Sequence, residues 1–110
     1  MPTNYKVLGQ INPTAFTNTT LYTVPSATQA VISTISVCNA NTTTSANYSI
    51  AIRPAGEALA SKHYFAANNV VGALDTIAIT VGLTLGNTDV VTVYASSPNV
   101  SFGIFGSEVT

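Results

Sequence analysis

Large aliphatic residues alternate with small or polar residues along much of this chain. The longest such segment is 75–85, where the aliphatic positions are Ile77, Ile79, Val81, Leu83 and Leu85. A repeat of two indicates a β-strand with one buried face. Segment 86–89 reads Gly-Asn-Thr-Asp, which favours a turn, and an apolar run resumes over 90–95. We therefore expect two strands joined by a hairpin or by a tight corner.

Shorter segments with strand character lie on both sides of this pair. They are 5–10, 20–24, 29–39, 48–52, 63–66 and 100–104. In 29–39, Val31 shares one predicted face with Ile35 and Val37, and Ile32 falls on the opposite face, so burial on both sides is expected. The pair Asn68-Asn69 predicts a turn, and 55–62 predicts a loop with one helical turn at most.

Seven or eight short strands with turn signals between them predict an all-β protein. The expected architecture is an antiparallel β-sandwich, either jelly-roll-like or Ig-like. A length of 110 residues suits one domain that spans residues 1–110. The order of the strands does not follow from the pattern.

The amino-acid composition indicates that the surface carries very few charged residues. Only 6% of residues are charged, three basic and four acidic, where about a quarter is usual. A folded chain of this mass exposes roughly 5,700 Å², so there is one charged residue for about every 800 Å² of surface. One partner contributes about the same area to a standard interface. This favours a subunit packed among other subunits. The alternative is a monomeric β domain kept soluble by Thr, Ser and Asn.

Charge and hydropathy exclude two classes of partner. Nucleic-acid binding needs clustered Lys and Arg, which three scattered basic residues and a net charge of −1 do not provide. No apolar run approaches the twenty or so residues of a membrane span. Residues 1–6 lack the pattern of a signal peptide. We expect no nucleic-acid partner and no membrane partner.

The residues that could carry chemistry are few. Cys38 is the only thiol and His63 the only histidine, and they could act as a catalytic pair only if the fold joined them. Because Cys38 lies inside a predicted strand, we expect it to serve packing. A metal site needs three or four ligands. The predicted set of catalytic, cofactor-binding and metal-binding residues is therefore empty, with no cofactor and no enzyme activity.

The acidic residues are expected to be structural. Glycosidase chemistry needs two facing carboxylates, and Glu57, Asp75, Asp89 and Glu108 are dispersed along the chain. Asp75 and Asp89 follow turns and are expected to cap them.

The segment 53–57 is the one local cluster with opposite charges. We expect Arg53 to pair with Glu57 or with carbonyls of a neighbouring subunit. Ligand recognition by Arg53 is the alternative.

Short segments spread over nearly the whole chain resemble a known family. They are Lys6-Val7-Leu8-Gly9-Gln10, Leu21-Tyr22-Thr23-Val24-Pro25, Ala30-Val31-Ile32-Ser33-Thr34-Ile35 with Val37-Cys38-Asn39, Arg53-Pro54-Ala55-Gly56, Asp89-Val90-Val91-Thr92-Val93-Tyr94-Ala95 and Val100-Ser101-Phe102. In order and spacing they resemble small virion structural proteins of tailed bacteriophages, of the cyanophage type. The turns 25–27 and 73–75 depart from the family's pattern, but the strand patterns do not.

The resemblance implies a virion component without catalytic residues. The expected function is that of a capsid decoration (cement) protein, a homotrimer on the capsid surface that binds the outer face of the major capsid protein and stabilises the head. The alternative is a tail or baseplate module, or a receptor-binding accessory module, that recognises host surface glycan through a neutral groove lined by Asn and Thr and through Tyr faces. A small hydrolase is a third hypothesis.

Overall fold

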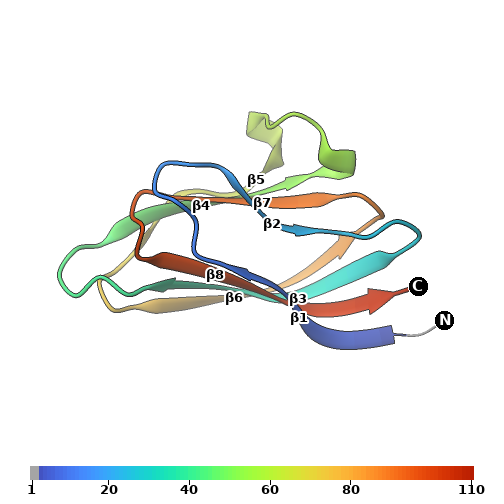
Figure 1. Ribbon diagram of the computed structural model, residues 1–110, viewed down its shortest axis with the longest axis horizontal. Coiled ribbons are helices and arrows are strands. Elements are labelled where there is room, and N and C mark those ends of the chain that lie inside the picture. The colour runs from blue at the N-terminus through green and yellow to red at the C-terminus, as the bar shows by residue number, and fades with distance from the viewer. Residues whose placement is uncertain (1–2) are drawn as a thin grey trace.

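Two four-stranded antiparallel sheets face each other in the computed structural model, which describes residues 3–110 (Figure 1). Sheet A contains, in spatial order, β1 (Thr3–Ile11), β8 (Val100–Val109), β3 (Gln29–Asn39) and β6 (Thr76–Leu85). Sheet B contains β2 (Thr19–Thr23), β7 (Val90–Ala95), β4 (Ala46–Arg53) and β5 (Tyr64–Val71). The predicted antiparallel β-sandwich is confirmed.

The pairing of the strands is nested. β4 pairs with β5, β3 with β6, β2 with β7 and β1 with β8, each pair antiparallel. The chain is thus a long hairpin, β1–β4 against β5–β8, that is rolled so that consecutive strands, except β4 and β5 at its tip, fall in opposite sheets (Figure 1). This is the topology of an eight-stranded jelly roll. Of the two sandwich types expected, the jelly roll is therefore the one formed.

One apolar core fills the space between the sheets. Sheet A contributes Phe102, Ile104 and Ile35, and sheet B contributes Val93 and Tyr48, all of them buried. The rings of Tyr48 and Phe102 meet edge to face across the gap, with centroids 6.4 Å apart. Burial of one such side chain contributes about 1.5–3 kcal/mol. The core thus supplies the main force that holds the two sheets together.

The segment 86–89 is a corner between sheets. β6 belongs to sheet A and β7 to sheet B, so they do not form a hairpin. Thr88 adopts a positive φ of 63° and its N–H donates to the Val24 carbonyl at 3.0 Å. Of the two connections expected here, the tight corner is correct.

The expectation that β3 is buried on both faces is wrong. The register of β3 against β8 and β6 shifts between Ile32 and Thr34, which places one extra residue, Ser33, in β3 relative to β8. A bulge exchanges the faces of a strand on its two sides. Ile32 therefore joins Ile35 in the core, whereas Val31 is turned outward and is 42% exposed.

The predicted turn at Asn68-Asn69 is also wrong, because both residues lie inside β5. Asn68 has a positive φ of 52°, and its N–H donates to Ser49 Oγ at 3.0 Å. The register of β5 against β4 shifts here, as expected for an irregularity within a strand. The preceding loop holds two short 3-10 turns, η1 (Pro54–Gly56) and η2 (Ser61–His63), where one helical turn was predicted.

Candidate functional site

The fold does not bring Cys38 and His63 together. Cys38 lies half-buried in β3 of sheet A, whereas His63 is buried in η2, beside β4 of sheet B. The His63 Nδ1 accepts the Ala60 N–H at 3.0 Å, so a neutral ring carries its proton on Nε2, which lies 3.3 Å from Glu57 Oε1. The histidine therefore closes the loop between β4 and β5.

The expected pair between Arg53 and Glu57 is wrong. Glu57 Oε1 lies 3.9 Å from Lys62 Nζ, in addition to its contact with His63. Within residues 3–110, the buried Arg53 Nε has no hydrogen-bond partner. A contact of Arg53 with a neighbouring subunit stays a prediction.

Two of the four acidic residues cap turns, as predicted. Asp75 Oδ1 accepts the Thr76 N–H at 2.9 Å. Asp89 accepts the Gly86 N–H at 2.8 Å and the Ala55 N–H at 2.9 Å. In the described part of the chain no three His, Cys, Asp or Glu side chains are grouped as metal ligands, and no helix there has the length and hydropathy of a membrane span.

Glu108 joins the two sheets. Its carboxylate is buried, lies 2.9 Å from Lys6 Nζ and accepts a hydrogen bond from the Tyr22 hydroxyl of sheet B. The contact with Lys6 is the largest effect that lowers the pKa of Glu108, and the hydrogen bond from Tyr22 is the second. Burial acts in the opposite direction but is smaller. The pKa of Tyr22 is raised, mainly by burial and further by the contact with Glu108. The sequence pattern did not predict this cluster. Its only indication in the sequence is the presence of an acidic residue, Glu108, in the apolar strand β8.

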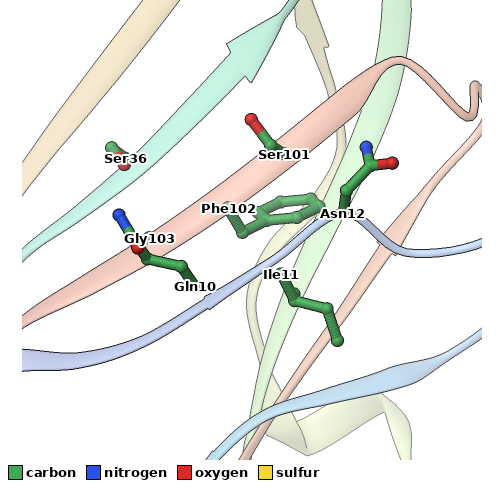
Figure 2. Close-up of a pocket in the computed structure, with 7 residues that line it drawn as sticks. All are labelled: Gln10, Ile11, Asn12, Ser36, Ser101, Phe102 and Gly103. Atoms are coloured by element: carbon green, nitrogen blue, oxygen red, sulfur yellow. The ribbon is translucent and has the colours of Figure 1, made fainter.

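A first hollow lies on the outer face of sheet A and is shown in Figure 2. It has a volume of about 380 Å³, and its polar groups come from Gln10, Asn12, Ser36 and Ser101 around Gly103. The Asn12 amide is already used, because its Nδ2 donates to the Val100 carbonyl at 2.8 Å and the Pro98 carbonyl at 3.0 Å. The one aromatic residue that lines this hollow, Phe102, is buried, so the lining offers a ligand only a few polar groups.

An apolar patch covers the other end of the same face. It consists of Tyr5, Val7, Val31 and Phe105 around a hollow of about 380 Å³, whose lining also includes Lys6, Ser33, Gly106 and Ser107. Tyr5 is 84% exposed and Val7 is 51% exposed. The bulge in β3 is what places Val31 in this patch, so the sequence pattern could not predict it.

A third hollow, which we call the tyrosine hollow, lies on the outer face of sheet B. It has a volume of about 330 Å³ and is lined by Asn18, Ser49, Tyr64, Ala67, Asn68 and Tyr94. The lining residues come from the loop before β2 and from β4, β5 and β7. The hollow therefore exists only because the sheet brings these strands together.

The fold and these surfaces define the molecule as a jelly-roll sandwich with two open faces. Comparison of the chain with models of protein families, with curated proteins and with solved structures finds no match.

Proposed function

We propose that this chain is a structural subunit of a bacteriophage virion, a capsid decoration protein that forms a homotrimer on the head. The observation that carries the proposal is the apolar patch of Tyr5, Val7, Val31 and Phe105 on the outer face of sheet A. In the proposed assembly this face binds the outer surface of the major capsid protein. The protein acts by binding and does not act as an enzyme.

Three features support this proposal. Exposed apolar residues that gather in one place are typical of an interface. The molecule exposes 5543 Å² and carries only three basic and four acidic residues, so it can lose a face of about 800 Å² to a partner without burying much charge. Jelly rolls recur in viral capsid proteins, although this last point is an analogy at the level of the fold. The resemblance of the sequence to virion proteins agrees with all three.

The patch can be tested with a single charge. Val31→Glu places a carboxylate in the proposed interface, where an unpaired charge is costly to bury, so binding to purified capsid shells should weaken at least about tenfold. Val70→Glu is the matched control, because Val70 is also exposed but lies on sheet B. Cosedimentation of each variant with shells that lack this protein measures the effect. Equal binding by the two variants, or no binding by the wild type, would contradict the proposed interface.

The copy number per particle distinguishes decoration from a place in the tail. A decoration protein follows the symmetry of the shell and should be present in on the order of hundreds of copies, whereas a tail or baseplate module should number roughly a few dozen at most. Quantitative mass spectrometry of purified particles gives this number. A low count would favour the tail or receptor-binding alternative over decoration.

A further inference from the structure

We propose that the tyrosine hollow on sheet B is a binding site for a neutral saccharide. This inference does not depend on the proposed decoration function, because it concerns the opposite face of the sandwich from the apolar patch. The ligand class is inferred from three properties of the hollow: the position of its two rings, its unused polar groups and its lack of charge.

Two aromatic residues of the hollow lie on the two strands that flank β4. Ser49 of β4 is paired with Tyr94 of β7 on one side, and its hydroxyl accepts the N–H of Asn68 of β5 on the other. Tyr64 of β5 is paired with Ala51, two residues further along β4. Neighbouring strands are about 4.8 Å apart, so β7 and β5 are separated by about 10 Å across β4. That space above Ser49 accommodates one sugar ring.

One of the rings is held in place by its own contacts. Phe16, in the loop between β1 and β2, meets Tyr94 edge to face with centroids 6.4 Å apart. The Phe16 N–H donates to the Ala95 carbonyl at 2.8 Å, which ties the loop to β7. Asn18 follows in the same loop and lines the hollow. The Tyr94 side of the hollow is therefore formed before a ligand arrives, which lowers the entropic cost of binding.

The polar side chains of the hollow are available to a ligand. The side-chain amides of Asn12 and Asn39 donate hydrogen bonds to backbone carbonyl groups. Among the hydrogen bonds of residues 3–110, by contrast, none involves the side-chain amide of Asn18 or Asn68. An amide offers two donors and an acceptor. The hollow thus presents amide hydrogen-bond donors and acceptors without partners among residues 3–110, beside two aromatic side chains.

The absence of charged residues from the lining selects the ligand class. None of the chain's Lys, Arg, Asp or Glu residues is among the six that line the hollow, so a phosphate or carboxylate would find no counter-charge. A sugar ring has an apolar C–H face, which packs on an aromatic ring, and a rim of hydroxyls, which amides can bind. A neutral hexose or N-acetylhexosamine matches both features.

Titration by NMR tests the site. The ¹⁵N-labelled protein is titrated with neutral oligosaccharides of glucose, galactose, mannose and N-acetylglucosamine, and with a sulfated disaccharide as the charged comparison. We expect at least one neutral series to shift the amide signals of Asn18, Ser49 and Asn68 with a Kd near about 1 mM. Tyr64→Ser should weaken this binding about tenfold through loss of the ring face.

Two further variants make the result decisive. Asn68→Gly removes the amide but keeps a residue that tolerates positive φ, and it should also weaken binding. Phe65→Ser is the matched control, because Phe65 follows Tyr64 directly in β5 but does not line the hollow, and it is 39% exposed where Tyr64 is 40% exposed. The inference is overturned if no neutral series shifts these signals at tens of millimolar, if the sulfated sugar binds equally well, or if Phe65→Ser weakens binding as much as Tyr64→Ser.

Discussion

Glu108 illustrates how a single residue can stabilise a sandwich that is poor in charge. Glu108 lies on β8 of sheet A, and its carboxylate accepts a hydrogen bond from the hydroxyl of Tyr22 on β2 of sheet B. Lys6 neutralises it from the neighbouring strand at 2.9 Å. Because a buried carboxylate without partners would be costly, the three residues act as one unit. They link the two sheets through a polar contact beside the apolar core.

This unit predicts how stability depends on pH. The pKa of Glu108 is lower in the folded protein than its ordinary value of 4.5, so its contribution is present above about pH 4.5 and is lost as the pH falls through the folded pKa. Glu108→Gln should lower the unfolding free energy at pH 7 by about 1–2 kcal/mol and flatten its decline in acid. Urea denaturation at pH 7 and pH 3 measures both effects.

The matched control for this experiment is Glu57→Gln. The Glu57 carboxylate is half exposed and lies in the loop between β4 and β5, so its removal should change stability little. An acid dependence that is the same in Glu108→Gln and in the wild type would show that other carboxylates govern it.

At the scale of elements, the irregularities of sheet A lie side by side. β8 runs without interruption, while β1 shifts register opposite Ile104 and Phe105, and β3 shifts register opposite Phe105 and Gly106. The β3 backbone approaches β8 so closely at this point that a Cβ on Gly106 would overlap the Val31 carbonyl oxygen. Gly106 is thus required for the bulge that turns Val31 outward.

Gly106→Ala should therefore destabilise the protein. Overpacking of this kind costs about 1–3 kcal/mol, and here the obstacle is backbone that cannot move aside as a side chain can. Gly82→Ala is the control, because a Cβ at Gly82 meets nothing within 4 Å. Thermal unfolding followed by circular dichroism should show a clear drop in Tm for Gly106→Ala alone. Equal Tm values for the two variants would mean that the close approach relaxes without cost.

At the scale of the whole molecule, the low charge leaves the outer strands β2, β5 and β6 without a charged residue, and β6 is the longest of the three. β6 is an outer strand of sheet A, and its ten residues, Thr76–Leu85, include no charged residue and no proline. Proteins that remain monomeric usually guard such an edge with Lys, Pro or a bulge; β6 has neither Lys nor Pro, and its pairing with β3 is irregular only between Thr80 and Leu83. An exposed edge of this length favours addition of a strand from another subunit. The edge thus supports the proposal that the chain assembles with copies of itself.

We expect the isolated protein to sediment as a trimer, with three times the monomer mass of 11.3 kDa. The number three follows from the proposed decoration role, and the tendency to assemble follows from the edge of β6. Because few charges are involved, association should change little between low and high salt. Sedimentation equilibrium at several salt concentrations measures both. A monomer at tens of micromolar would contradict the proposed assembly.

A lysine on the edge identifies the surface that associates. Thr80→Lys should shift the protein toward monomer, because a charge on an edge strand opposes pairing with a second chain. Thr20→Lys places the same charge on β2, one of the two outer strands of sheet B, and should leave association unchanged. The same effect from both substitutions would indicate a general response to charge.

Local pattern determined where most strands of this chain lie, because alternation and turn chemistry depend only on near neighbours in sequence, but it placed a turn inside β5. It also determined that Asp75 and Asp89 cap turns. The strand order, the outward position of Val31 and the cluster around Glu108 depend on pairing between distant segments, which no local pattern encodes. For the same reason, only the tertiary structure could place Asn18, Ser49, Asn68 and the two tyrosines around one hollow.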